Sequence, residues 1–148
     1  MSYAGDISPL EAWDLLRERD DAVLVDVRTE AEWRYVGVPD TSGIGRPTVL
    51  IEWVSYPAGA RNDKFVDQLK EALSGRSAGS APGGITGGSP VIFLCRSGQR
   101  SVGAAEAATA AGIEPSYNVL DGFEGAIDED GHRGATGWRA LGLPWRQS

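Results

Sequence analysis

The residues best suited to chemistry lie in one short stretch, VIFLCRSGQRS at residues 91–101, which holds the only cysteine of the chain. Cys95 follows four apolar residues and precedes Arg96, Gly98 and Arg100. A thiolate is a strong nucleophile, and nearby cationic side chains or a helix N-terminus stabilise it. These residue types predict a reactive sulfur in a loop that can hold an anion.

Two other interpretations of Cys95 compete with this one. Free cysteine is among the most often buried residue types and packs as a small hydrophobe, but two arginines and two serines are unusual neighbours for a core position. A cysteine protease pair would need His132, the only histidine, which lies in an acidic, glycine-rich stretch. The sequence favours the reactive thiolate.

The elements on either side of Cys95 are expected to position it. VIFL predicts a buried strand, and SVGAAEAATAAG at residues 101–112 predicts an alanine-rich helix. A strand that leads through a tight loop into a helix N-terminus points backbone N–H groups and the positive end of the helix dipole into the loop. This order of elements predicts an anion-binding loop around Cys95.

The rest of the chain alternates helices and strands. Ser8, Pro9 and Glu11 form a capping box that opens a helix, with Leu10, Trp13, Leu15 and Leu16 expected on its packed side. Further strands are expected at AVLVDV, TVLIEW and SYNVL, and helices at residues 29–33 and at NDKFVDQLKEAL, with Asn62 as cap.

This alternation predicts an α/β fold, an open, twisted, parallel sheet of about five strands with helices on both faces. Ligands of such folds lie beyond the carboxyl ends of the strands, where Asp26, Cys95 and Asp121 are expected to gather. We expect residues 1–148 to form a single domain with a flexible Gly/Ser-rich loop at about 74–90. A C-terminal extension at about 126–148 is expected to hold one short helix and to pack Trp138, Leu141 and Trp145 against the body.

Composition and charge exclude several classes of function. The 21 acidic and 14 basic side chains give a net charge of -7, which repels nucleic acids and anionic membranes. No apolar run is long enough to span a membrane, and the start of the sequence lacks the pattern of a secretory signal. With one cysteine and one histidine, the chain has no metal-ligand cluster. We expect a cytoplasmic protein with no metal, no cofactor, no nucleic-acid partner and no membrane partner.

Three motifs together resemble the rhodanese-like sulfurtransferases. LVDVRTEAEW at residues 24–33 is similar to the Asp-Val-Arg motif of that family with its following Glu and aromatic residue. VIFLCRSGQRS is similar to its strand and active-site loop, and NVLDGFEG at residues 118–125 to the segment after its last strand. The resemblance covers about residues 5–125. It departs at VGVPDTS, residues 36–42, which lacks the Gly-His-Ile and Pro-Gly-Ala residues common in the family.

The resemblance implies a sulfurtransferase. Cys95 would take a sulfane sulfur from a small anionic donor such as thiosulfate, become a persulfide, and pass the sulfur to cyanide, a thiol or a protein acceptor. The active-site loop would consist of Arg96, Ser97, Gly98, Gln99, Arg100 and Ser101. The two arginines would attract the donor, and the alternative for each is an ion pair that braces the loop.

Four further residues, Asp26, Arg28, Glu32 and Asp121, are expected to support the site structurally, because attack by an ionised thiolate needs no general base. Asp26 is expected to accept hydrogen bonds from loop N–H groups, and Arg28 to pair with Glu32 beside the cleft. Asp121, which precedes Gly122, is expected to form a turn.

Two alternative functions remain. A cysteine-dependent phosphatase of related fold has one more residue between its cysteine and arginine than the four that separate Cys95 from Arg100, and Ser101 occupies the position of that arginine. A non-catalytic rhodanese-like module that only binds a protein would not need the nucleophile. The shorter loop and the presence of Cys95 favour the sulfurtransferase.

Overall fold

The computed structural model describes residues 3–19, 21–44, 48–54, 60–76, 90–125, 127 and 129–147. Its main sheet is parallel and has five strands in the order β1-β6-β5-β2-β4. These strands are β1 (Gly5–Ile7), β2 (Val23–Asp26), β4 (Val49–Leu50), β5 (Val91–Leu94) and β6 (Ser116–Val119). The predicted α/β fold with a five-stranded parallel sheet is confirmed.

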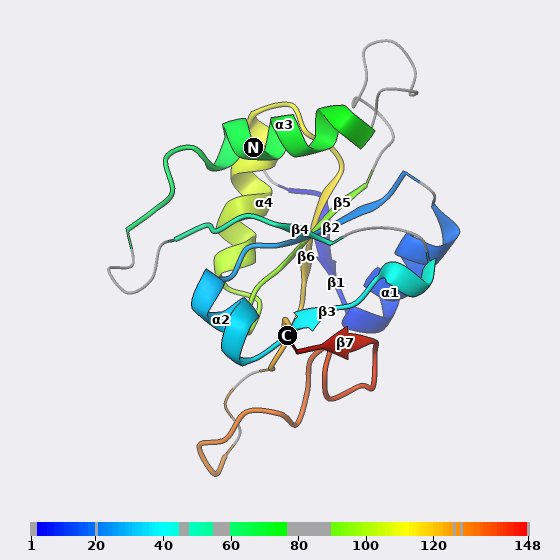
Figure 1. Ribbon diagram of the computed structural model, residues 1–148, viewed down its shortest axis with the longest axis vertical. Helices are drawn as coiled ribbons and strands as arrows, with labels where there is room; N and C mark the ends of the chain where they lie inside the picture. The colour runs from blue at the N-terminus through cyan, green and yellow to red at the C-terminus, as the bar shows by residue number, and fades with distance from the viewer. Residues whose placement is uncertain are drawn as a thin grey trace.

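Helices cover both faces of this sheet (Figure 1). They are α1 (Pro9–Glu18), α2 (Glu30–Tyr35), α3 (Phe65–Arg76), α4 (Arg100–Ala110) and the 3-10 helix η1 (Ser42–Ile44). Val25 and Phe93 belong to a buried cluster with residues of α3 and α4. Leu24 and Ile92, which point to the opposite face, belong to a second cluster with α1. The central strands are therefore buried on both faces, as their continuous apolar runs predict.

The predicted start of α1 is confirmed. The side chain of Ser8 accepts the N–H of Glu11 at 3.1 Å, and Glu11 Oε1 accepts the N–H of Ser8 at 2.8 Å. Leu10, which we expected on the packed side, is 51% exposed, whereas Ala12 and Leu16 are buried. Ala12 and Leu16 lie about one turn apart, and Leu10 lies roughly half a turn from Ala12 around the helix.

Strand β4 is shorter than the sequence predicts. TVLIEW indicates a strand over residues 48–53, but only Val49–Leu50 pair, with β2 alone. Asn62 caps the turn before α3, because its Oδ1 accepts the N–H of Lys64 at 3.1 Å. The stretch expected as a flexible loop, at about 74–90, falls largely outside the described residues, although residues 74–76 are the last of α3.

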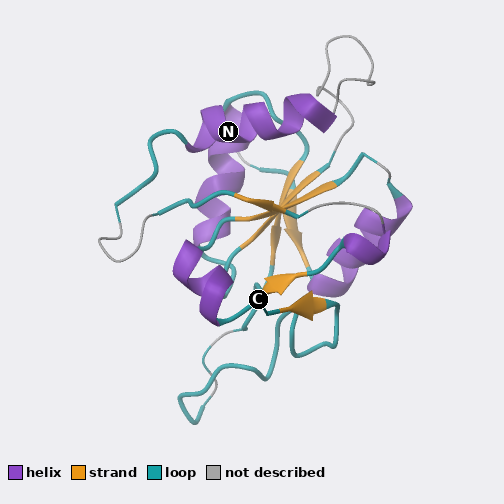
Figure 2. Ribbon diagram, in the orientation of Figure 1, coloured by secondary structure: helices purple, strands orange, loops and turns teal. Residues whose placement is uncertain are grey.

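The C-terminal region differs from its prediction. In place of a helix, the described residues from 129 onward form turns and strand β7 (Trp145–Arg146), which pairs antiparallel with β3 (Val38–Pro39) (Figure 2). Trp138 is fully buried and its Nε1 donates to the carbonyl of Pro144 at 2.7 Å, but Leu141 and Trp145 are exposed. Gly137 has a φ of 98°, a backbone conformation that a helix does not allow.

Candidate active site

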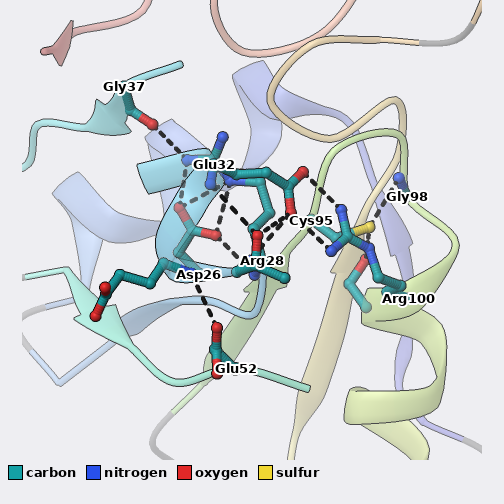
Figure 3. A network of polar contacts seen from close by, with 11 residues as sticks. Asp26, Arg28, Glu32, Gly37, Glu52, Cys95, Gly98 and Arg100 are labelled. Atoms are coloured by element: carbon teal, nitrogen blue, oxygen red, sulfur yellow. Dashed lines mark hydrogen bonds and ion pairs between the residues drawn. The ribbon is translucent and has the colours of Figure 1, made fainter. Parts of the chain in front are cut away.

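Cys95 follows the last residue of β5, at the centre of the sheet between β2 and β6. Its side chain is only 1% exposed. Five residues later the chain enters α4 at Arg100, so the sulfur lies beside a helix N-terminus, as the order of elements predicts (Figure 3). Arg100 and Glu32 meet above the same loop.

The sulfur has two polar contacts. The N–H of Gly98 donates to Cys95 Sγ at 3.1 Å, and Ser101 Oγ lies 3.3 Å from Sγ. Gly98 has a φ of 95°, and a Cβ there would lie 3.1 Å from the carbonyl oxygen of Val119. Only glycine combines this backbone conformation with so close an approach, and both bring its N–H to the sulfur.

The turn after β6, at residues 121–125, is hydrogen-bonded to the Cys95 loop. The N–H groups of Phe123 and Glu124 donate to the carbonyls of Cys95 and Arg96, at 2.8 and 2.9 Å. Asp121 lies in this turn with a φ of 63°, and its carbonyl accepts the N–H of Gly125 at 2.8 Å. A Cβ on Gly122 would collide with the carbonyl oxygen of Cys95, so the two loops lie in direct contact.

Arg100 forms a two-pronged ion pair with Glu32. The distances are 2.8 Å from Nη1 to Oε1 and 2.8 Å from Nη2 to Oε2, and the Arg100 and Glu32 side chains are 25% and 17% exposed. Burial alone would raise the pKa of Glu32, but the hydrogen bonds from Arg100 and from the backbone of Thr29 outweigh it and lower this pKa from 4.5 to about 2. The bond to Glu32 also raises the pKa of Arg100. This pair ties the start of α4 to α2.

The expected pair between Arg28 and Glu32 is wrong. Arg28 instead binds Asp26, with Nη2 2.7 Å from Oδ2 and Nε 3.0 Å from Oδ1, and both side chains are fully buried. Asp26 also accepts the backbone N–H of Arg28 at 3.1 Å. The reason is geometric. Asp26 is the last residue of β2 and lies two residues before Arg28, whereas the carboxylate oxygens of Glu32 already accept hydrogen bonds from Arg100 and Thr29.

The buried arginine has further contacts that the sequence did not reveal. Nη2 of Arg28 donates to the carbonyl of Gly37 at 2.6 Å, and its guanidinium carbon lies 4.3 Å from the centre of the Phe123 ring. Nη1 has no hydrogen-bond partner within the described ranges. Figure 3 shows Arg28 between Asp26 of β2 and Gly37 before β3. Through Phe123, Arg28 also contacts the turn that supports the Cys95 loop.

The remaining loop residues differ in exposure. Arg96 and Gln99 are exposed, and Ser97 is half-buried. Arg96 forms no ion pair with any residue that the structure describes. Gln99 is the N-cap of α4 but makes no capping hydrogen bond with its side chain. Arg96 therefore offers an exposed guanidinium at the surface of the loop.

Sequence reasoning missed two groups at this site. Thr29 caps α2 through a capping box with Glu32, a pattern that T-E-A-E at residues 29–32 carries. Asn118 is buried on β6 and contacts Ser101 Oγ, and an asparagine inside a predicted strand was its one signal. Across the described ranges, no three acidic, histidine or cysteine side chains gather as a metal site would require, and no helix has the length and apolarity to cross a membrane.

Known proteins place the chain in a family. The protein-family model of the Rhodanese-like domain matches residues 8–129 of this chain. The crystal structure of Rv0390 from M. tuberculosis is 59% identical, with a TM-score of 0.85, and the match covers 99% of this chain and 100% of that one. The uncharacterized protein RC0915 of Rickettsia conorii is 32% identical over 95% of both chains.

Two more distant structures share the fold alone. One is a polysulfide-sulfur transferase homodimer from Wolinella succinogenes, at 23% identity and a TM-score of 0.54 over 97% of this chain and 79% of that one. The other is RPA3614 of Rhodopseudomonas palustris, described as a possible tyrosine phosphatase. It is 19% identical, with a TM-score of 0.53, and the match covers 99% of this chain and 85% of that one. Because these names differ, the fold does not decide the activity. What the family model and the identities above establish is that this chain belongs to the rhodanese-like domain family.

Proposed function

We propose that the protein is a sulfurtransferase that carries a sulfane sulfur on Cys95. The observation that supports this most directly is the position of its one thiol, which receives the N–H of Gly98 within a loop that leads into α4. A thiolate and a terminal persulfide sulfur are both anions, and loop N–H groups stabilise either. Family membership supports the same reaction class.

The reaction consists of two displacements on sulfur. The Cys95 thiolate attacks the outer sulfur of thiosulfate, a new S–S bond forms, and sulfite leaves with the electron pair of the bond that breaks. Cyanide or a thiolate then attacks the terminal sulfur of the persulfide, and the Cys95 thiolate leaves. Each displacement transfers a sulfur atom between nucleophiles, so no cofactor or external oxidant is needed.

The two arginines have different roles in this proposal. Arg96 is exposed and unpaired among the described residues, so it attracts the anionic donor to the mouth of the loop. Arg100 is held by Glu32, so it fixes the loop and adds a positive field near the sulfur. The interpretation of Arg100 as an ion-pair brace, left open by the sequence, is supported by its two hydrogen bonds to Glu32.

The size and burial of the loop favour a sulfur donor over a phosphate ester. Four residues separate Cys95 from Arg100, one fewer than surrounds a tetrahedral phosphate in cysteine-dependent phosphatases. Cys95 is also only 1% exposed, which favours a small donor over a phosphorylated protein side chain. A module that only binds a partner needs neither the thiol nor the N–H bond to it.

Intact-mass spectrometry tests the proposal. After incubation with thiosulfate, the wild-type protein should gain the mass of one sulfur atom, and cyanide or dithiothreitol should remove it. Cys95→Ser, which keeps a similar side-chain size, should gain nothing. An unchanged mass with thiosulfate, polysulfide and a persulfide donor would reject the proposal, and turnover of an aryl phosphate would then identify a phosphatase.

A further inference from the structure

A chain of polar contacts leads from Cys95 to the edge of the sheet. Ser101 Oγ contacts both Cys95 Sγ and Asn118 Oδ1. Asn118 Nδ2 donates to Asp6 Oδ1 at 2.9 Å, and the hydroxyl of Tyr3 donates to the same oxygen at 2.7 Å. Cys95, Ser101 and Asn118 are buried, and Asp6 is exposed on β1.

The orientation of the Asn118 amide is set by Asp6. Asp6 is the register partner of Asn118 across the β1–β6 pair, so the two side chains face each other. A carboxylate accepts hydrogen bonds and cannot donate them, so it selects the NH₂ end of the amide. The hydrogen bond to Asp6 also raises the pKa of Tyr3, which keeps that phenol protonated as a second donor. The carbonyl end of Asn118 is therefore directed at Ser101.

The hydroxyl of Ser101 has one proton and two acceptors. When Cys95 is a neutral thiol, its S–H can point to Ser101 Oγ while the Ser101 O–H is donated to Asn118 Oδ1, and every group in the chain is satisfied. When Cys95 ionises, the Ser101 O–H can stabilise the thiolate only by leaving Asn118. The buried amide carbonyl then loses its partner, which costs free energy.

We propose that Asn118, oriented by Asp6, is a positioning residue that restrains the ionisation of Cys95 by competing with the sulfur for the Ser101 proton. The inference deepens the proposed function, because it rests on Cys95 acting there as a nucleophile. It assigns to the edge strand β1 an influence on the sulfur through three consecutive hydrogen-bond contacts. Removal of the Asn118 carbonyl frees the Ser101 proton and favours the thiolate.

Other charged groups also act on Cys95, and the test has to separate them. Arg100 lies close enough to Cys95, to Glu32 and to Asp26 to interact electrostatically with each of them. The further charged side chains on the elements around the loop are Arg28, Glu30, Glu32, Arg34, Arg96, Glu106, Asp121 and Glu124. None of them changes in the variants below, so they contribute equally to each profile.

The measurement is the rate at which iodoacetamide alkylates Cys95, the only cysteine, as a function of pH and without any sulfur donor. Asn118→Leu removes the amide at similar volume and should move the midpoint of the profile down by about one pH unit, the equivalent of one hydrogen bond. Asp6→Asn, on the exposed edge, removes the carboxylate that orients Asn118 and should move it down by less. Asp6→Asn also removes a negative charge, which alone would lower the midpoint slightly.

Ser101→Ala supplies the control for both variants. If Asn118 and Asp6 act through the Ser101 proton, neither Asn118→Leu nor Asp6→Asn should move the midpoint by more than about 0.3 unit in the Ser101→Ala background, as expected for coupled residues. A shift of the same size in both backgrounds, no shift, or a shift upward in the Ser101 protein overturns the inference. If Asn118→Leu does not fold by circular dichroism, Asp6→Asn decides.

This test is independent of the persulfide measurement. Alkylation reports the ionisation of Cys95 whether or not the protein transfers sulfur. If the midpoint of the alkylation profile shifts as expected but no persulfide forms, the role of Asn118 is supported and the sulfurtransferase proposal is rejected. If a persulfide forms but the midpoint does not shift, the sulfurtransferase proposal is supported and the role of Asn118 is rejected.

Discussion

Two arginine–carboxylate pairs lie near the Cys95 loop, and they differ in burial and reach. Asp26 and Arg28 are fully buried and two residues apart in sequence, whereas Glu32 and Arg100 are partly exposed and 68 residues apart. The first pair holds together the strand end, the carbonyl of Gly37 and the ring of Phe123. The second joins α2 to α4 beside the sulfur. The difference indicates that the fully buried pair maintains the fold and the partly exposed pair maintains the loop.

The largest effect is expected from breaking the buried pair. Arg28→Ala leaves Asp26 without its ion-pair partner in a site with no solvent access, so the free energy of unfolding should fall by about 3–5 kcal/mol. Urea denaturation followed by circular dichroism measures it. Arg28→Lys keeps the charge but not the two-pronged geometry, so its free energy of unfolding should lie between those of the wild type and Arg28→Ala. A loss below about 1 kcal/mol for Arg28→Ala would contradict a fold-maintaining role.

The Glu32–Arg100 pair predicts an acid-sensitive contribution to stability. Folding lowers the pKa of Glu32 from 4.5 to about 2, so its contribution is fully present above pH 4.5 and disappears as pH falls through about 2. Fully realised, it would be about 3 kcal/mol. Glu32→Gln should remove this part of the pH dependence, which denaturant titrations between pH 5 and pH 2 would detect. Identical profiles for the two proteins would refute it.

A smaller effect is expected on the reaction. Arg100→Ala removes a charge-assisted contact at the loop, worth about 1.5–3 kcal/mol, so kcat/KM for thiosulfate should fall tens-fold. Glu32→Gln is the matched control because it keeps the Arg100 charge. If both variants lose activity equally, Arg100 acts through the ion pair alone. If Arg100→Ala matches wild type, it has no part in donor use.

The smallest effect is expected from an exposed ion pair that is not one of the two near the Cys95 loop. Asp14 and Arg17 on α1 lie 2.9 Å apart with side chains 57% and 56% exposed. Solvent screens such pairs, so Arg17→Ala should change the free energy of unfolding by less than about 0.5 kcal/mol. The same urea titration provides the measurement. A larger loss would mean that burial does not separate the two pairs near Cys95 either.

Local patterns of the sequence predicted most of the fold. The apolar runs of β2 and β5 and the capping box of α1 each depend on neighbouring residues, so they can be recognised without a tertiary structure. Strands β1, β3 and β7 are short and exist because of pairing with residues far along the chain. Local patterns carry no signal for such pairing. The prediction of a C-terminal helix was wrong because glycines in that region adopt positive φ.

The candidate site shows the same division. The order of strand, loop and helix around Cys95 was readable, and the structure confirms that order. The partner of Arg28 was not readable, because both Asp26 and Glu32 lie within reach in sequence and only packing decides between them. Asn118 and Asp6 are 112 residues apart, so their contact follows from the sheet order alone.

The contact between the Cys95 loop and the turn at residues 121–125 also limits how this protein can diversify. The backbone of Gly122 touches the carbonyl of Cys95, and Gly98 lies against the backbone of Val119 and Asp121. An added residue in either loop would push one backbone into the other. A change in loop length, and with it in the size of the anion accommodated, therefore requires a matching insertion or deletion in the other loop.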